Sequence, residues 1–259
     1  MKISLRWLQE YVDVEMPRSE LLNRLTMIGL ICEEWTETPD GDTVLDIETY
    51  ANRPDTLGHL GIAREVSTMT GFPLKERVHP VVELPAETSE LVEVEVLDED
   101  LCPRYTGFVV KGVTVGPSPD SLRKKIEAMG AKPINNIVDA SNIVLFATGH
   151  PVHMFDLNKV AGPRVVVRRA KKGETLRTLD GRQRALAPDM LVIADDRRPI
   201  AVAGIIGGEE SGITSATRDI FVESAVFDPA SIRRTRKALE IMTDASYRFE
   251  RGADIGFAP

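Results

Sequence analysis

The last quarter of the chain, residues 204–252, holds residue types that could build a small ligand pocket. It contains a glycine pair, Gly207 and Gly208. Adjacent glycines let backbone N–H groups approach a ligand oxygen closely, although the same pair also suits a tight turn between strands. The segment lacks the G-x-G-x-x-G order and no helix-forming stretch follows it. We therefore reject dinucleotide binding here.

A single carboxylate, Glu223, lies in an apolar run that reads as a strand. Alternation along a strand places Glu223 on the same face as Phe221 and Ala225. A carboxylate on an apolar face is costly unless it is paired or hydrogen-bonded. Glu223 is therefore either an edge residue in water or a buried acceptor for a ligand hydroxyl.

His153, Thr243 and Ala245 complete the set of candidate pocket residues. Pro151 lies between His150 and His153 and prevents a regular helix there, which argues against a metal-binding histidine pair. His153 is then either a structural imidazole bonded to the backbone or a pocket residue. Thr243 and Ala245 suit a pocket floor, but Thr243 equally suits the cap of a helix start. Ser246, which follows Ala245, is not part of a G-x-S-x-G motif, and the sequence shows no arrangement typical of a catalytic triad.

The elements that must position these residues indicate an α+β fold with two domains and a linker. Residues 1–80 read as a small α+β domain, 81–90 as a linker rich in proline and acids, and 91–259 as a larger mixed-sheet α+β domain. In the small domain we expect helices that Ser4 and Ser19 cap, strands at 31–36 and 43–47, and a helix at 59–70. In the large domain we expect strands at 92–96, 105–115, 165–169, 191–194, 200–204 and 219–223, and helices at 120–129, 134–147 and 229–240, the last of them leading to Thr243.

Composition places the chain among cytoplasmic globular proteins. Hydrophobic residues make up 42% and charged residues 28% of the sequence. We expect no membrane association, because no apolar run approaches the roughly 20 residues that cross a bilayer and the N-terminus lacks a signal-peptide core.

The two cysteines have no Cys or His at ligand spacing, so zinc and disulfide scaffolds are not expected. The net charge of −8 argues against a protein that grips nucleic acid over its whole surface, but basic clusters at 168–172 and 233–237 leave local contact open.

An ordered set of segments resembles the bacterial phenylalanyl-tRNA synthetase β subunit. The set comprises the opening MKISLRWLQEYV, Ala51-Asn52-Arg53-Pro54-Asp55, Cys102-Pro103-Arg104-Tyr105, Pro151-Val152-His153-Met154-Phe155-Asp156, Gly207-Gly208-Glu209-Glu210-Ser211-Gly212 and Thr243-Asp244-Ala245-Ser246. The resemblance implies that residues 1–80 are similar to the subunit's B1 domain. It implies that residues 91–259 are similar to its B3/B4 editing domain.

The resemblance implies an editing hydrolase that removes tyrosine mischarged onto tRNA(Phe). The implied catalytic residues are Thr243, His153 and Gly207, and the implied substrate-binding residues are Glu223, Ala245, Lys132 and Gly208. Glu223 would accept the phenol O–H of tyrosine, and a buried acceptor of that kind rejects a substrate that lacks the hydroxyl. Editing would need no metal or cofactor. ATP and magnesium would serve only aminoacylation by the complete synthetase, whose α subunit and tRNA(Phe) are the implied partners.

Two departures from the family pattern shape the expected activity. A short turn stands where the family usually carries an OB-fold tRNA-binding insertion, and the chain stops before the portions that pair with the α subunit. We therefore expect an N-terminal part of the subunit that cannot itself aminoacylate. The alternatives are a non-catalytic, tRNA-contacting scaffold and a free-standing homologue that acts on another small aromatic ester.

Overall fold

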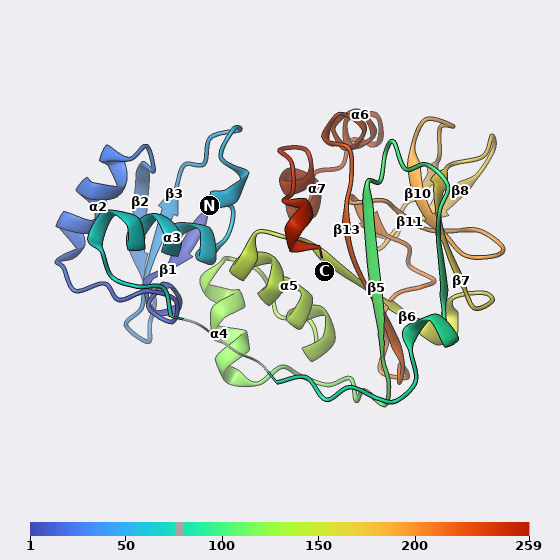
Figure 1. The fold of residues 1–259 in the computed structure, drawn as a ribbon, viewed down its shortest axis with the longest axis horizontal. Helices are drawn as coiled ribbons and strands as arrows, with labels where there is room; N and C mark the ends of the chain where they lie inside the picture. The colour runs from blue at the N-terminus through green and yellow to red at the C-terminus, as the bar shows by residue number, and fades with distance from the viewer. Residues whose placement is uncertain (76–79, 259) are drawn as a thin grey trace.

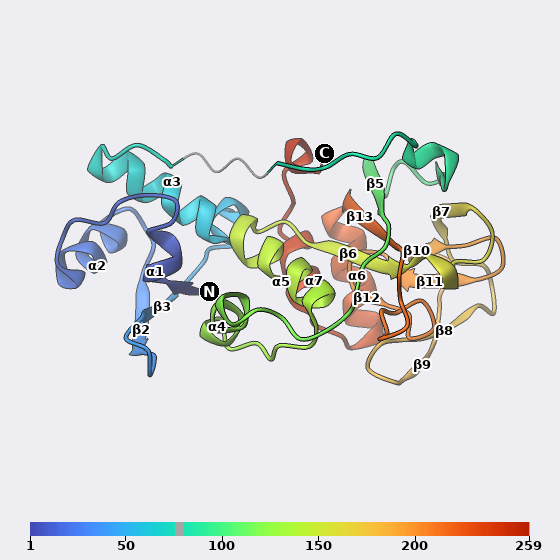
Figure 2. The same ribbon diagram turned by 90° about the horizontal axis from the view of Figure 1, so that it is seen from below.

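The fold is α+β, as the sequence predicts. The structure is a computed structural model that describes residues 1–75 and 80–258, so part of the predicted small domain and the last residue of the predicted large domain lie outside the described residues. A small unit of helices and a three-stranded sheet lies at one end of the molecule (Figure 1). Three further sheets lie at the other end, and α4 and α5 lie between (Figures 1 and 2).

The N-terminal unit is a three-stranded antiparallel sheet with helices packed on it. The strand order is β1-β3-β2. Its elements are β1 (Lys2–Ser4), α1 (Leu5–Leu8), α2 (Arg18–Met27), β2 (Cys32–Glu37), β3 (Thr43–Ile47), η1 (Pro54–Thr56) and α3 (His59–Thr70). Ser4 caps α1 as predicted, because its hydroxyl accepts a 3.0 Å bond from the amide of Trp7. The predicted cap at Ser19 is wrong: α2 starts at Arg18 after Pro17, whose ring-restricted φ leads directly into the helix.

The larger unit contains a mixed five-stranded sheet and an antiparallel three-stranded sheet. Their strand orders are β12-β11-β10-β7-β4 and β5-β13-β6, and β4 is parallel to β7. A third, two-stranded sheet pairs β8 with β9 antiparallel. The strands are β4 (Glu93–Val96), β5 (Arg104–Val110), β6 (Val152–Asp156), β7 (Arg164–Arg169), β8 (Thr175–Arg177), β9 (Gln183–Ala185), β10 (Leu191–Ala194), β11 (Pro199–Val202), β12 (Ile206–Gly207) and β13 (Ile220–Val226). The helices are η2 (Thr88–Glu90), α4 (Asp120–Ala128), α5 (Asn136–Thr148), η3 (Leu157–Lys159), α6 (Pro229–Leu239), α7 (Asp244–Phe249) and η4 (Ile255–Phe257).

Several elements differ from the sequence-based expectation. The strand predicted at 105–115 ends at Val110. The helix predicted at 229–240 ends at Leu239, and the short strands β6, β8, β9 and β12 are not among the predicted strands. β8, β9 and β12 have only two or three residues, too few to show an alternating pattern, whereas β6 has five and follows directly after Pro151.

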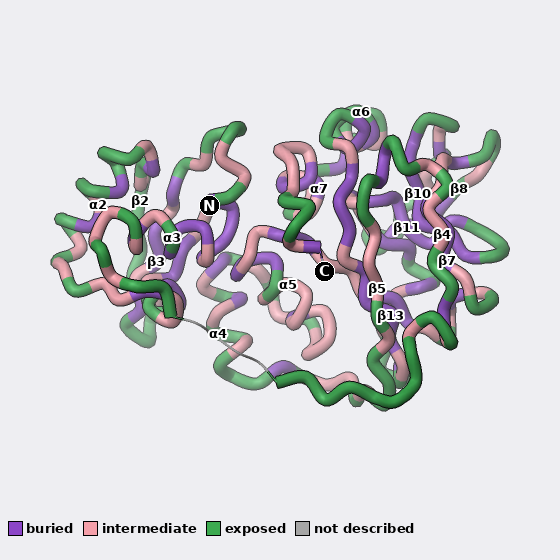
Figure 3. Tube along the Cα trace, in the orientation of Figure 1, coloured by how far each residue is buried: buried purple, intermediate pink, exposed green. Residues whose placement is uncertain are grey.

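The largest hydrophobic core lies in the larger unit, between the five-stranded sheet and the three-stranded sheet. Phe155, Phe221 and Ala225 from the three-stranded sheet belong to the same buried cluster as Val167 and Ile193 from the five-stranded sheet. The buried stretches of β10, β11 and β13 are visible in Figure 3. Full burial of one such side chain stabilises the fold by roughly 1.5–3 kcal/mol. The face of β13 that carries Phe221 and Ala225 therefore points into this core.

The N-terminal unit packs directly against α5 and α7. His59 is fully buried: its Nδ1 donates to the carbonyl of Phe146 at 2.8 Å, and its Nε2 accepts from the amide of Ser4 at 3.1 Å. Arg248 Nε donates to the carbonyl of Leu57 at 3.2 Å. At Gly58, a Cβ would overlap the backbone of Gly149, so only glycine allows this approach. The division into domains at residues 81–90 stays a prediction.

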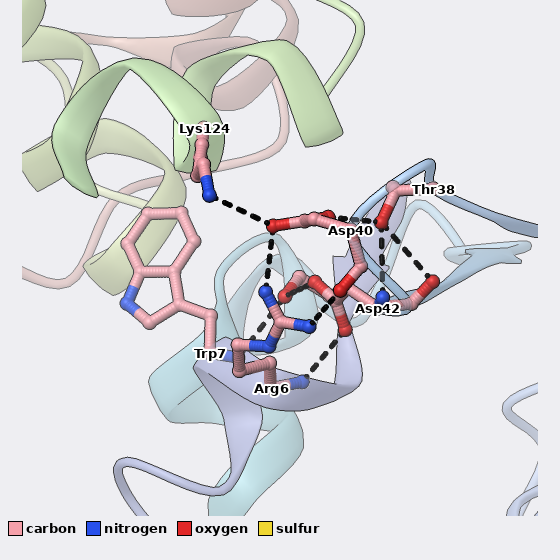
Figure 4. Close-up of polar contacts among 7 residues, drawn as sticks. Arg6, Trp7, Thr38, Asp40, Asp42 and Lys124 are labelled. Carbon is pink, nitrogen blue, oxygen red and sulfur yellow. Dashed lines mark hydrogen bonds and ion pairs between the residues drawn. The ribbon is translucent and has the colours of Figure 1, made fainter. Parts of the chain in front are cut away.

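A polar cluster links the β2–β3 turn to α4 (Figure 4). Asp40 pairs with Arg6 at 2.8 Å and with Lys124 of α4 at 3.4 Å. Hydrogen bonds from Thr38 and Arg6 hold the pKa of Asp40 well below its usual value. The cluster borders a depression of about 610 Å³ that Trp7 also lines. The short turn thus fixes α4 against the N-terminal unit. Within the described part of the chain, no helix has the length and apolar character needed to cross a membrane.

Candidate functional site

The candidate site is centred on Glu223 in the middle strand of the three-stranded sheet. In the strand register, Glu223 stands opposite Gly107 of β5 on one side and His153 of β6 on the other. Directly opposite residues point to the same face of a sheet. Phe221 and Ala225 are buried on that face. The structure therefore brings His153 and Glu223 together.

Glu223 is a buried carboxylate that accepts a phenol O–H. Its side chain is only 6% exposed, which removes the alternative of an edge residue in water. Oε2 accepts a 2.7 Å hydrogen bond from the hydroxyl of Tyr105 on β5. Burial raises the pKa of Glu223 to about 7, although the bond from Tyr105 acts in the opposite direction. The carboxylate therefore changes its charge near neutral pH.

His153 lies beside Glu223 on the edge strand β6 and is partly buried. Its ring meets that of Phe155 edge-on, with centroids 4.5 Å apart. Burial lowers the pKa of His153 to about 4, so the imidazole is neutral at pH 7. Among the described residues neither ring nitrogen has a hydrogen-bond partner, and neither is a buried orphan atom. The alternative of a backbone-bonded structural imidazole therefore does not hold.

Gly207 provides the close approach between the two sheets. It lies in β12, the edge strand of the five-stranded sheet. A Cβ on Gly207 would lie 2.6 Å from Cε1 and 2.8 Å from Nε2 of His153. The neighbouring Gly208 uses its amide within the sheet, where it donates to the carbonyl of Ile200 at 2.8 Å. A side chain at 207 would displace the imidazole, so glycine is needed for packing as well as for any ligand contact.

Thr243 and Ala245 lie at the start of α7. The Thr243 hydroxyl donates to the carbonyl of Ile205 at 2.8 Å and accepts from the amide of Ser246 at 3.0 Å. The Ser246 hydroxyl oxygen accepts a 2.9 Å bond from the amide of Thr243, which completes a capping box. Thr243 thus ties α7 to the segment that leads into Gly207. Ala245 is partly buried against the two-sheet core.

Replacing Thr243 by alanine is expected to destabilise the fold by about 1 kcal/mol, because the helix loses its cap. Thr243→Ser keeps the hydroxyl and should retain most of that stability. Urea unfolding of both variants measures the difference. Equal stabilities for the alanine and serine variants would show that the cap contributes nothing.

Lys132 does not join the other candidates. It is exposed in the connection between α4 and α5, and no contact ties it to Glu223 or His153. Its neighbour Ala131 lines a depression of about 420 Å³ together with Thr243, Asp244 and Arg248. Lys132 is thus one residue from a depression at the start of α7 and does not itself line it. Its role in substrate binding stays a prediction.

Sequence reasoning missed Tyr105 as a site residue. Tyr105 and Gly107 alternate along β5, which is a signal that the two share a face. That Tyr105 reaches Glu223 depends on the β5–β13 register, because the two residues are not directly opposite but diagonal. Leu179 was also missed: it donates its amide to the carbonyl of Gly207 at 3.0 Å and lies against the same glycine.

The two arginines of the basic cluster at 168–172 are paired with acids. Arg168 pairs with Glu174 at 2.7 Å, and Arg169 pairs with Asp98 and Asp100. In the second cluster, Arg236 pairs with Glu250. Pairing of this kind leaves less positive charge for phosphates. Across residues 1–75 and 80–258, no group of three or more His, Cys, Asp or Glu side chains is placed to hold a metal ion.

The arrangement can read a hydroxyl and position a polar group. The Glu223 carboxylate already accepts a hydrogen bond from the phenol of Tyr105. A carboxylate oxygen can accept a hydrogen bond from the phenol of a ligand in the same way. His153, with a pKa of about 4, is a weak base at neutral pH and is better suited to orienting a substrate than to removing a proton.

Comparison with known proteins supports the family expected from the sequence. Residues 101–258 match the family model described as the B3/4 domain. The phenylalanine–tRNA ligase β subunit of Rhodopirellula baltica is 41% identical over 98% of this chain and 37% of its own length. That of Moorella thermoacetica is 47% identical over 84% of this chain and 27% of its own. The chain thus spans about a third of the length of the curated relatives it matches.

A solved structure was also found, an N-terminal fragment of the phenylalanyl-tRNA synthetase β subunit from Pyrococcus horikoshii. It covers 93% of this chain and 73% of its own at 16% identity, with a TM-score of 0.47. The family model covers more than half of this chain and includes Glu223, His153 and Tyr105. The chain belongs to the B3/4 domain family, and its curated relatives are phenylalanine–tRNA ligase β subunits.

Proposed function

We propose that this chain is an editing module that hydrolyses tyrosine mischarged onto tRNA(Phe). The observation that carries the proposal is the Glu223 carboxylate, which is buried beside His153 and already accepts a phenol O–H at 2.7 Å. Tyrosine differs from phenylalanine by the hydroxyl that such an acceptor recognises. Phenylalanine would leave the acceptor unpaired, and sites of that kind discriminate by about 10⁴ or more.

The hydrolysis needs no covalent nucleophile, because the aminoacyl ester is already activated. Water attacks the ester carbonyl, the bond to the ribose oxygen breaks, and the products are free tyrosine and the tRNA with its ribose hydroxyl restored. His153 would orient the ester, and backbone amides at Gly207 would stabilise the charge that develops on the carbonyl oxygen. Thr243 would act by fixing α7 beside Ile205, since its hydroxyl proton is already donated there.

The partners proposed for this module are tRNA(Phe) and the α subunit of the complete synthetase. They are inferred from the curated relatives, which are β subunits of that enzyme. ATP and magnesium would be needed for aminoacylation by the complete enzyme and not for editing. The module itself would work as a hydrolase.

A non-catalytic scaffold is the second candidate. The observation in its favour is that the Thr243 hydroxyl is fully engaged in the helix cap and in the bond to Ile205. In that case the unit formed around α7 would hold tRNA or other parts of the subunit without turnover.

The test is release of tyrosine from Tyr-tRNA(Phe) by the 259-residue chain, with Phe-tRNA(Phe) as the matched substrate. Selective release of tyrosine would support the editing module. If no tyrosine is released while free tyrosine still raises the melting temperature more than phenylalanine does, the hydrolase proposal fails for this chain and the binding role stands. Absence of both effects would favour the scaffold.

A further inference from the structure

The Glu223 carboxylate divides its two oxygens between different surroundings. Oε2 is bonded to Tyr105. Among the described residues Oε1 has no hydrogen-bond partner, yet it is not among the buried orphan atoms, which belong to His150, Arg164 and Arg251. Oε1 is therefore reached by solvent even though the residue as a whole is 6% exposed. One oxygen is held by the protein and the other can receive a ligand.

We propose that Tyr105 is a positioning residue for this carboxylate: its hydroxyl fixes Oε2 of Glu223 so that Oε1 is the oxygen that receives the phenol of a tyrosyl ester. The proposal rests on the editing function proposed above. Tyr105 acts through Glu223 and does not itself contact the ester.

The strand register explains how Tyr105 reaches its partner. Tyr105 pairs with Ala225 across β5 and β13, while Gly107 pairs with Glu223. Tyr105 is therefore the diagonal neighbour of Glu223, and a tyrosine side chain is long enough to span that separation. The ring of Phe221 covers Gly107, where a Cβ would overlap it. The bond from Tyr105 thus holds one oxygen of the carboxylate in place.

The same bond favours the ionised acceptor. The groups around Glu223 are Tyr105 from β5, His153 from β6 and Cys102 from the segment before β5. Burial, together with the charge of Glu223, raises the pKa of Cys102 to about 12 and that of Tyr105 well above its usual value, so both stay protonated. His153 stays neutral at pH 7. Glu223, whose pKa is about 7, is the member of this group that changes charge near neutrality.

The test is Tyr105→Phe in the 259-residue chain, which removes the hydroxyl and keeps the ring. Two properties are measured between pH 6 and 8.5: kcat/KM for Tyr-tRNA(Phe) and Phe-tRNA(Phe), corrected for uncatalysed hydrolysis, and the ¹³C titration of the Glu223 carboxyl. Loss of a hydrogen bond to a charged group should raise the titration midpoint by about one to two pH units. The preference for the tyrosyl ester should fall by about 10-fold or more at pH 7 and partly recover at pH 8.5. Tyr50→Phe, which removes a half-exposed hydroxyl from the N-terminal unit, is the matched control.

The outcomes separate this proposal from the proposed function. If the wild-type chain prefers the tyrosyl ester and Tyr105→Phe keeps that preference with an unchanged midpoint, the positioning role is wrong and the editing function stands. A stronger preference in the variant would show that Tyr105 competes with the ligand, which also overturns the proposal. If the wild-type chain shows no preference, the editing function fails and the ligand named for Oε1 fails with it. The ¹³C titration then shows separately whether the Tyr105 hydroxyl lowers the pKa of the Glu223 carboxyl.

Discussion

Glu223→Ala is expected to lower kcat/KM for Tyr-tRNA(Phe) by about 10²-fold or more and to leave the value for Phe-tRNA(Phe) nearly unchanged. The physical reason is that only the tyrosyl ester offers a hydroxyl to the buried carboxylate. Glu223→Gln keeps a neutral acceptor oxygen of the same size. We therefore expect an intermediate loss of about 10-fold, since hydrogen bonds to charged groups are stronger than those to neutral ones.

The measurement is single-turnover release of each amino acid from its tRNA. Glu34→Ala, which removes an exposed carboxylate from β2, is the control for the loss of one negative charge. Equal losses for the tyrosyl and phenylalanyl esters would contradict the acceptor role, because they would indicate general damage to the site. Unfolding curves of the alanine variant exclude loss of the fold as the cause.

The second large effect is a pH-dependent gain in stability on Glu223→Gln. The pKa of Glu223 is about 7 in the folded chain and 4.5 in the reference state. The folded state therefore binds more protons than the unfolded state between these values, and the free energy of unfolding falls as pH rises from 4.5 to 7. The loss is about 3 kcal/mol in total. Glutamine does not ionise, so the variant should gain about that amount over wild type between pH 5 and pH 8.

His153 has the opposite dependence and explains why the wild-type chain alone would hide this effect. Its pKa is about 4 when folded and 6.5 in the reference state, so the stability it contributes is present above 6.5 and is lost as pH falls toward 4. The two contributions oppose each other between pH 4.5 and 6.5. Urea unfolding of wild type and Glu223→Gln at pH 5, 6, 7 and 8 gives the difference directly, because the histidine contributions cancel. A pH-independent difference would show that Glu223 is not buried as a titrating group.

The site depends on how two sheet edges meet. β6 brings His153, β12 brings Gly207, and the central strand β13 brings Glu223. Both β6 and β12 are edge strands, and each pairs with a single neighbouring strand of its sheet. A change that loosens either edge would therefore separate the imidazole from the glycine without altering any side chain of the site.

The sequence by itself determined the α+β class, the helix at 59–70, the helix predicted at 229–240, which ends one residue earlier at Leu239, and the strand face on which Glu223 lies. These follow from local signals: helix period, turn residues and strand alternation are set by neighbours in the chain. The ordered motifs also identified the family, whose model matches residues 101–258. Of the two alternatives open for Glu223, burial was decided by the structure, since alternation gives a face and not what covers it.

Only the tertiary structure decided the partners of the site residues. That Glu223 lies between Gly107 and His153 is a matter of strand register, and a shift of one residue would reverse the faces. That Tyr105 donates to Glu223 follows from contacts between positions 118 apart in the sequence. Thr243 reaches Ile205 by the packing of α7 against the segment before β12. Local residue patterns encode elements, whereas long-range pairing assembles the carboxylate, the imidazole and the glycine into one site.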